Sequence, residues 1–271
     1  MTRAELTAFF SRPMEALLAD GGLRAALEAL LDSLERGELR AAEKAADGSW
    51  GANAWVKTGI LAGFRSSAIV AFGDWPGGAS DKAAFPPRLL GPADEVRMVP
   101  GGSSVRRGVR LGRGVVIMPP AYINVGAWVG EGTMVDSHAL VGSCAQVGAK
   151  VHLSAGAQIG GVLEPAGAMP VVVEDGAFIG ALCGLVEGVV VRSRAVLAPG
   201  TIVSAATTIY DLVKGRELRG EIPEGAVVVP GSRPARGDFA AARGISLYAP
   251  CIVKYRDEGT DAATVLEEAL R

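Results

Sequence analysis

The chain has 271 residues, a formal net charge of −2 and an isoelectric point near 5.8, so it offers no basic surface for nucleic acid or an anionic membrane. Hydrophobic residues make up 49% of it but aromatic residues only 6%, and it contains 37 glycines. Its three cysteines are far apart and form no CxxC pair, which argues against a zinc site or disulfide framework and favours a reduced, cytoplasmic protein. No segment resembles a signal peptide or a membrane span.

Residues 1–96 are expected to form an α-helical N-terminal domain. Their clearest signal is a leucine stripe at helical spacing, comprising Leu23, Leu27, Leu30, Leu31 and Leu34. The glycines of "ADGG" mark a helix boundary, and the helical pattern is followed as far as "AAEKAADGSW". "AWVKTGILAGFR" predicts a further helix. The segment "GDWPGGASDKAAFPPRLLGP", rich in Gly and Pro, is interpreted as a connector.

Residues 97–211 contain a repeat of six. An aliphatic residue recurs at every sixth position, and small or branched residues often follow four places later. The series is Val105, Leu111, Ile117, Ile123, Val129, Val135, Val141, Val147, Leu153, Ile159 and, eight positions later than expected, Val173, Ile179, Leu185, Val191, Leu197, Val203 and Ile209. A chance bias toward Gly, Ala and Val would not keep this phase through both blocks.

A six-residue period fits neither a helix nor an alternating strand. It fits a short strand and a turn, repeated three times to close a triangular coil whose aliphatic residues point inward against the neighbouring coils. The predicted fold is therefore mainly β, a left-handed parallel β-helix of hexapeptide repeats. The handedness comes from the known hexapeptide-repeat class and not from the period itself.

Residues 212–271 are expected to form a small C-terminal cap. "LVKGRELRGEIP" is interpreted as a charged loop that could steer a nucleotide or as a solvated hairpin tip. "EIPEGAVVVPGSRPA" is interpreted as strand-like pieces, "ISLYAPCIVKYRDEGT" as a terminal hairpin or strand, and "DAATVLEEALR" as a short final helix.

The stretch "TMVDSHALVGSCAQ" brings together an acid, a histidine and a cysteine, but the repeat separates them. Cys144 directly precedes the small corner residue Ala145, so a packing role is predicted for it. Asp136 and His138 lie between inward positions and can reach the surface.

Several motifs resemble the tetrahydrodipicolinate N-succinyltransferases of lysine and diaminopimelate biosynthesis. "MPPAYINVGAWVGEGTMVD" and "VGSCAQVGAKVHLSAGAQIGGVLEP" carry the resemblance within the repeats. "GELRAAEKAADGSW", "VRMVPGGSSVRRG", "PEGAVVVPGS" and "SLYAPCIVKY" carry it outside them, where a generic hexapeptide acyltransferase would differ.

The resemblance implies a homotrimer with an active site in each groove between neighbouring chains. It implies transfer of succinyl from succinyl-CoA to the amino group of L-2-amino-6-oxopimelate, the ring-opened acceptor. No metal and no tightly held cofactor are implied, and succinyl-CoA serves only as a co-substrate.

The resemblance also implies roles for individual residues. Arg97 occupies the position of an arginine that would clamp a substrate carboxylate, although it could be a solvated linker residue. Asp136 would bind the substrate ammonium and help to remove its proton. His138 is a candidate base, because histidine side chains ordinarily titrate near neutrality. The alternative is that it is a plain surface residue. Lys254 is a possible partner for a phosphate of CoA.

Three positions depart from the family pattern. Better-known members have Arg-Ser-Glu after "FIGA", whereas this chain has Leu182 at the arginine position and Gly184 at the glutamate position. His138 stands where those members have tryptophan. Two alternatives therefore stay open, a paralogue that uses another acyl donor or amino-acid acceptor, and a β-helix that has lost catalysis.

Overall fold

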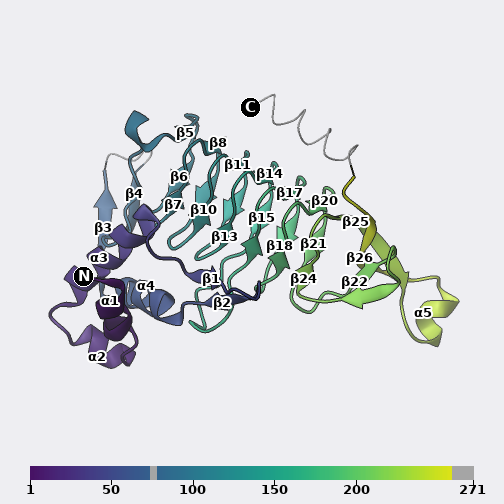
Figure 1. Cartoon of the computed structure of the whole chain (residues 1–271), viewed down its shortest axis with the longest axis horizontal. Helices are drawn as coiled ribbons and strands as arrows, with labels where there is room; N and C mark the ends of the chain where they lie inside the picture. The colour runs from purple at the N-terminus through teal and green to yellow at the C-terminus, as the bar shows by residue number, and fades with distance from the viewer. Residues whose placement is uncertain (74–77, 258–271) are drawn as a thin grey trace.

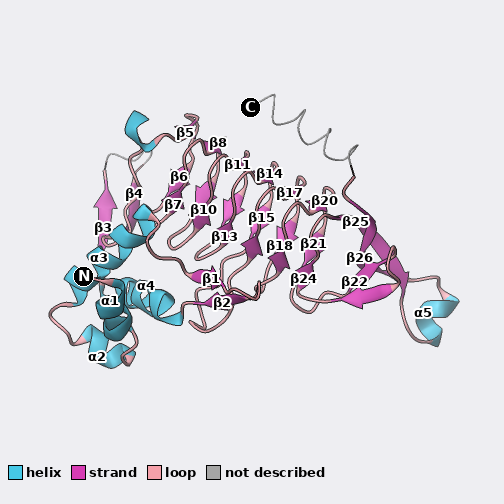
Figure 2. Ribbon diagram, viewed as in Figure 1, coloured by secondary structure: helices cyan, strands magenta, loops and turns pink. Residues whose placement is uncertain are grey.

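A computed structural model describes residues 1–73 and 78–257, and a triangular β-prism dominates it (Figures 1 and 2). Its walls are three stacks of parallel strands, joined in turn by short corners. The prediction of a mainly β, left-handed parallel β-helix with a helical N-terminal domain and a small cap is confirmed.

The three walls are named here by the strands they contain. The first face comprises β7 (Arg110–Leu111), β10 (Trp128–Val129), β13 (Gln146–Val147), β16 (Val172–Val173), β19 (Val190–Val191) and β24 (Glu221–Ile222). The second face comprises β5 (Arg97–Met98), β8 (Val116–Ile117), β11 (Met134–Val135), β14 (His152–Leu153), β17 (Phe178–Ile179), β20 (Val196–Leu197) and β25 (Ala226–Pro234). The third face comprises β6 (Ser104–Val105), β9 (Tyr122–Ile123), β12 (Leu140–Val141), β15 (Gln158–Ile159), β18 (Gly184–Leu185) and β21 (Ile202–Val203).

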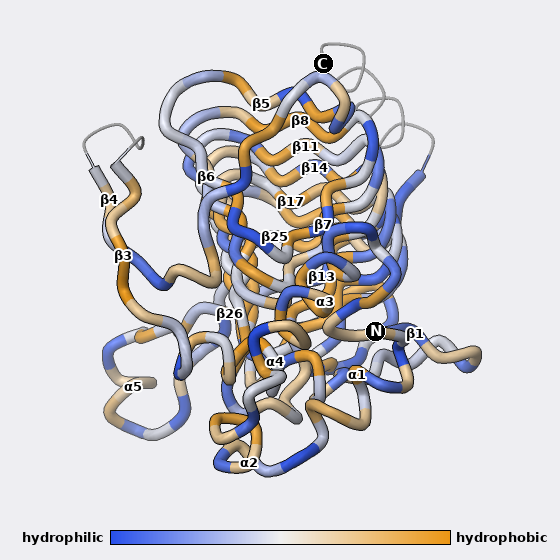
Figure 3. The backbone as a smooth tube through the Cα atoms, turned by 90° about the vertical axis from the view of Figure 1, so that its left-hand side faces the viewer, coloured by the Kyte–Doolittle hydropathy of each residue, from blue (hydrophilic) through white to orange (hydrophobic). Residues whose placement is uncertain are grey.

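The inward residues of the repeat form one continuous core. Successive coils pair in register, as in Val135 with Leu153 and Val141 with Ile159. Every residue of the predicted series is at most 6% exposed. In the end-on view of Figure 3, the strands of the second face lie one behind another along the prism. The period of six therefore located the core correctly.

The corners of the prism require an unusual backbone conformation. The residue two places before many strands has a positive φ, and it is often glycine, as at Gly108 (φ 81°) and Gly126 (φ 76°). A side chain in this left-handed region is strained. His138 (φ 61°), Cys144 (φ 65°) and Leu182 (φ 58°) nevertheless occupy such corners.

One line of corners separates the second face from the third, and we call it the corner ladder. It consists of Pro120, His138, Gly156, Leu182 and Gly200. Backbone hydrogen bonds tie its levels together: His138 N–H donates to the Pro120 carbonyl and Leu182 N–H donates to the Ala155 carbonyl at 3.0 Å. Residues on either side of this ladder therefore stand in fixed rows along the prism.

The N-terminal domain packs on another edge and on the first face. Its helices are α1 (Arg3–Phe10), α2 (Met14–Leu18), α3 (Leu23–Arg36) and α4 (Ala54–Ser66), and the short 3-10 helix η1 (Pro92–Asp94) precedes the prism. Leu31 and Ile60 approach the corner glycines Gly108 and Gly126 so closely that a Cβ there would lie within 3 Å of them. Cys144 is fully buried in the same contact. The packing role predicted for Cys144 is confirmed.

The helical prediction was wrong for residues 41–50, where no helix forms. This segment is a hairpin of β1 (Ala42–Lys44) and β2 (Trp50–Ala52). The Asp47 carboxylate accepts a hydrogen bond from Ser49 N–H at 2.9 Å, and Gly48 has φ 85°, so this stretch turns sharply. A second hairpin, of β3 (Ile69–Phe72) and β4 (Ala79–Lys82), follows α4.

The end of the coil also differs from the expectation. Ile209 is buried, but it belongs to β22 (Ile209–Asp211), which pairs with β23 (Arg216–Leu218) and with β26 (Ser246–Tyr255). Ile222 stacks on Val191 in its place. The period of six cannot distinguish an inward residue of the coil from one that caps it. The domain boundary predicted after residue 211 thus lies inside a segment that leaves the coil, and the coil resumes with β24 and β25.

The cap consists of the long hairpin β25–β26, the hairpin β22–β23 and the short helix α5 (Asp238–Ala242). The strands expected in "EIPEGAVVVPGSRPA" and "ISLYAPCIVKY" are confirmed. The expected final helix at 261–271 lies outside the described residues.

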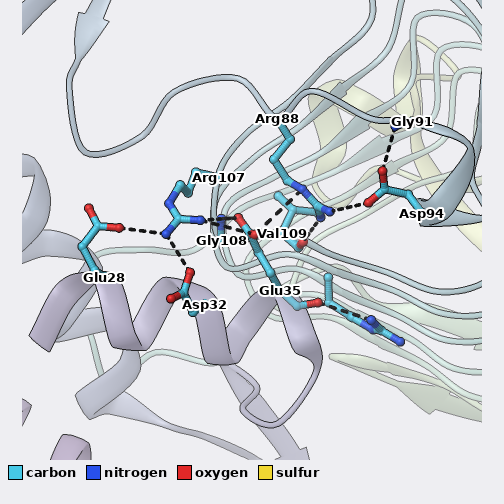
Figure 4. A network of polar contacts seen from close by, with 10 residues as sticks. Glu28, Asp32, Glu35, Arg88, Gly91, Asp94, Arg107, Gly108 and Val109 are labelled. Carbon is cyan, nitrogen blue, oxygen red and sulfur yellow. Dashed lines mark hydrogen bonds and ion pairs between the residues drawn. The ribbon is translucent and has the colours of Figure 1, made fainter. Parts of the chain in front are cut away.

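An ion-pair network fixes α3 to the start of the prism (Figure 4). The Arg107 guanidinium lies 2.8 Å from both the Glu28 and the Asp32 carboxylates and 3.4 Å from the Glu35 carboxylate. Glu35 also accepts a hydrogen bond from Gly108 N–H at 2.7 Å. One face of α3 thereby holds a prism corner through charge as well as through its leucines.

A second network fixes the β1–β2 hairpin to the first face. The buried Glu174 carboxylate accepts hydrogen bonds from Trp50 Nε1 at 2.8 Å and from Arg192 at 3.0 Å, and it pairs with Lys44 at 2.9 Å. Burial alone would raise the pKa of Glu174. The hydrogen bonds from Trp50, Lys44 and Arg192 outweigh it and lower the pKa to about 2.

We predict that Glu174 makes stability depend on acid pH. Its folded-state pKa lies below the ordinary value of 4.5, so its stabilisation is present above that pH and is lost as the pH falls toward 2. Glu174→Gln should lower the free energy of unfolding at neutral pH by about 3 kcal/mol. It should also flatten the fall of Tm between pH 4.5 and pH 2. Glu221→Gln, which alters an exposed partner of Arg192, is the control. Equal acid slopes in both variants would contradict the prediction.

Candidate active site

Asp136 lies directly after β11, beside the corner ladder. Its inward neighbour Val135 belongs to the core, so alternation along the strand turns Met134 and Asp136 outward. The half-buried Asp136 carboxylate accepts a hydrogen bond from Ser137 N–H at 2.7 Å. No side chain among the described residues neutralises it. Asp136 can therefore receive a cationic or proton-donating group that approaches the second face.

His138 is the ladder corner two residues beyond Asp136. Its backbone is held on both sides, because its N–H donates to the Pro120 carbonyl and its carbonyl accepts from Gln158 Nε2 at 3.1 Å. The residue is exposed, and no hydrogen bond joins its imidazole to Asp136. The structure thus places His138 beside the candidate site without coupling it to the acid.

Arg97 lies on the same face as Asp136, at the start of the prism. It is paired in register with Val116, which is paired with Met134. Two strand spacings across the sheet and two residues along it separate the Arg97 and Asp136 Cα atoms by about 12 Å. The Arg97 side chain is exposed and pairs with no carboxylate among the described residues. One face therefore presents a free guanidinium and a free carboxylate.

Lys254 lies far from Asp136 and Arg97. It lies on β26, which follows β11 by five strands in the sheet order, or roughly 24 Å at about 4.8 Å per strand. Its ammonium pairs with Asp257 at 3.4 Å. Its predicted contact with CoA stays a prediction.

Leu182 lies on the corner ladder, and Gly184 lies across it from Asp136. Leu182 is 70% exposed, an unusual state for a leucine. Gly184 is buried on β18, where a Cβ would lie 2.9 Å from Cδ1 of Ile202. Ile202 is itself 46% exposed. Where the family pattern has an arginine and a glutamate, this chain has an apolar surface.

Tyr248 completes that surface, although no sequence pattern pointed to it. Its hydroxyl accepts a hydrogen bond from Ile202 N–H at 2.7 Å, which caps the outermost strand of the third face. The motif "SLYAPCIVKY" contributed to the resemblance, but the repeat does not reach it. Nothing in the spacing could therefore link Tyr248 to Ile202.

Cys144 and His152 both have structural roles. Burial raises the pKa of the Cys144 thiol to about 12, so the thiolate is strongly disfavoured. His152 is 5% exposed and stacks on Phe178 with ring centroids 4.7 Å apart. Within residues 1–73 and 78–257, no group of three His, Cys, Asp or Glu side chains could hold a metal ion. None of the helices in these ranges is long and apolar enough to cross a membrane.

Comparison with known proteins identifies the family. Residues 4–66 match the family model described as the N-terminal part of tetrahydrodipicolinate N-succinyltransferase. The chain is 43% identical to the 2,3,4,5-tetrahydropyridine-2,6-dicarboxylate N-succinyltransferase of Afipia carboxidovorans, covering 98% of this chain and 96% of the relative. It is 44% identical to the enzyme of the same name from Paramagnetospirillum magneticum, covering 94% of this chain and 92% of that one.

A solved structure shares the fold. It is that of a 2,3,4,5-tetrahydropyridine-2-carboxylate N-succinyltransferase from Campylobacter jejuni, with a TM-score of 0.55 and 18% sequence identity. The match covers 89% of this chain and 64% of the other. The sequence relatives span both end domains as well as the prism, and they show that the chain belongs to the family of tetrahydrodipicolinate N-succinyltransferases.

Proposed function

We propose that the protein transfers a succinyl group from succinyl-CoA to the amino group of L-2-amino-6-oxopimelate, in lysine and diaminopimelate biosynthesis. The observation that carries this proposal is identity above 40% to enzymes of that name over nearly the whole chain. The free Asp136 carboxylate beside the corner ladder supplies a group that the reaction needs.

The chemistry is the aminolysis of a thioester. The neutral amine attacks the thioester carbonyl, the C–N bond forms, the C–S bond breaks, and the sulfur leaves as CoA thiol with one proton. The acceptor amine is mostly protonated at neutral pH, so a group must bind the ammonium and accept its proton. Asp136 suits this role because its carboxylate is half-buried and unpaired. The side chains and backbone of the protein would suffice, with succinyl-CoA as the co-substrate.

Arg97 would hold the acceptor in place. A guanidinium binds a carboxylate through two parallel hydrogen bonds. The acceptor is a seven-carbon chain with carboxylates, and Arg97 and Asp136 stand about 12 Å apart at their Cα atoms on one face. The long Arg97 side chain can close much of that separation around such a chain. Orientation of this kind is itself a large part of catalysis.

The enzyme would act as a homotrimer. Arg97 is exposed and Asp136 half-buried on an open sheet face, and no described segment of a single chain closes over them to exclude water. The outward residues of that face are largely apolar and partly exposed: Val116, Met134, Phe178 and Val196. A second copy packed beside this face would turn it into the wall of a groove. The reaction would take place in the cytoplasm, where acyl-CoA donors are found.

We therefore expect sedimentation equilibrium of the purified protein to give three times the chain mass of 27.8 kDa. Met134→Arg, which puts a charge on the apolar face, should reduce the mass and the activity together. Trimers that persist in this variant would move the interface away from the second face, and a monomeric wild type would contradict the trimer.

A paralogous activity is the second candidate, and Leu182 and Gly184 favour it. Neither can replace the ionic and acid–base groups of the family pattern, and the exposed Leu182 suits a less charged substrate. An N-acyltransferase with another acyl donor or amino-acid acceptor would explain both residues.

The deciding measurement is release of CoA thiol in the presence of tetrahydrodipicolinate. We expect rapid release with succinyl-CoA and much slower release with acetyl-CoA. Faster release with acetyl-CoA, or none until another amine is supplied, would replace the proposed reaction with the paralogous one. No release with any donor, and no retention on immobilised CoA, would indicate a non-catalytic prism.

Asp136→Asn should lower kcat by a hundredfold to ten-thousandfold, the range typical of a lost general base. The amide keeps the size of the side chain, so folding should be unaffected. His138→Asn tests the competing base, because asparagine tolerates the left-handed corner. If His138→Asn causes the larger loss of kcat, then the imidazole and not Asp136 accepts the proton.

A further inference from the structure

Three arginines line one hollow in the C-terminal cap. The hollow has a volume of about 430 Å³ and is formed by Arg219 from the β22–β23 hairpin and by Arg233 and Arg236 from the chain at the end of β25. Thr208 and Tyr210 also line it and add two hydroxyl groups. Side chains from segments far apart in the sequence thus converge on one space.

These arginines are positioned without being neutralised. Arg219 Nε donates to Thr208 Oγ1 at 3.2 Å, and the Arg233 guanidinium donates to the Pro234 carbonyl at 3.3 Å. None of the three forms an ion pair within the described part of the chain. Elsewhere guanidinium groups face carboxylates, as Arg107 and Arg192 do.

The charge of the hollow therefore suits an anion. Glu217 is the one carboxylate residue among the described side chains that line it, so three guanidinium groups face a single acid. The protein as a whole carries a formal charge of −2, so this local excess of positive charge runs against the overall composition. Planar guanidinium groups with several free N–H donors match the oxygens of phosphate groups.

A chain of contacts links the hollow to the candidate active site. Leu247, which lines the hollow, is the neighbour of Tyr248 on β26. Tyr248 accepts a hydrogen bond from Ile202 N–H, and the Ile202 side chain closes over Gly184 beside the corner ladder. An extended ligand with its reactive end at the ladder could place its far end in the cap.

We infer that the hollow of Arg219, Arg233 and Arg236 binds the phosphate-bearing end of the acyl-CoA donor. This inference rests on the proposed function, which requires such a donor. It gives the phosphate contact to these arginines and not to Lys254, whose ammonium is paired with Asp257.

Binding of 3′,5′-ADP to the full-length protein, measured by calorimetry, tests the inference without any reaction. Arg233→Ala and Arg219→Ala should each weaken binding about tenfold, and the double variant more, with a reduced dependence on salt. Arg243→Ala is the matched control, because Arg243 stacks on Phe239 in the same cap and does not line the hollow. Equal affinity in all variants would overturn the inference. Binding of pyrophosphate as tight as that of 3′,5′-ADP would also overturn it, since the hollow would then be a general anion site.

A kinetic comparison connects the hollow to the donor. The ratio of kcat/KM for succinyl-CoA to that for succinyl-pantetheine should fall about tenfold in Arg233→Ala. The substitution removes a phosphate contact that only succinyl-CoA can make, because succinyl-pantetheine has no phosphate groups. An unchanged ratio would refute the contact with the donor. If the wild type transfers no succinyl group but still binds 3′,5′-ADP through these arginines, then the proposed reaction fails while the phosphate site stands.

Discussion

The stacking of one inward aliphatic side chain per hexad is the constraint on which the rest of the molecule depends. Each such side chain contributes about 1.5–3 kcal/mol when it is withdrawn from water. None of these inward side chains can take part in binding or catalysis, because every coil is covered only by its neighbours. Functional groups are therefore confined to outward strand positions, to the corners and to the two ends. Asp136, His138 and Arg97 all obey this restriction.

The corners add a second constraint, because they select residues by backbone conformation. A left-handed corner disfavours any side chain by about 1–2 kcal/mol, and glycine avoids this cost. Cys144 occupies such a corner where its thiol fills the contact with the N-terminal domain. His138 and Leu182 occupy corners on the ladder and point to solvent in the described chain. Residues that have a strained backbone and no packing role are therefore candidates for a functional role.

The N-terminal domain determines which surfaces remain open. The Arg107 network holds α3 at one edge (Figure 4), and the Glu174 network holds the β1–β2 hairpin on the first face. Both networks use charges that are paired and partly or fully buried. The second face and the corner ladder stay uncovered by the domain, and these surfaces carry the unpaired Asp136 and Arg97. The paired charges thus belong to the scaffold, and the unpaired charges belong to the candidate site.

What the sequence could predict follows from the range of each interaction. The core was predictable because its signal repeats every six residues. The resemblance singled out Asp136 and Arg97, but only the structure shows that they lie on one face. The β1–β2 hairpin was missed because Trp50 finds its partner Glu174 only in the fold, 124 residues away in the sequence. The arginine hollow was missed for the same reason, since its residues come from separate turns of the cap. Leu182 and Gly184 were visible in the sequence, but only the structure shows that Ile202 and Tyr248 join them in one apolar surface. If Arg97 clamps an acceptor carboxylate as proposed, recognition of the acceptor would depend on it more heavily than the family pattern implies, because Leu182 and Gly184 supply no charged group.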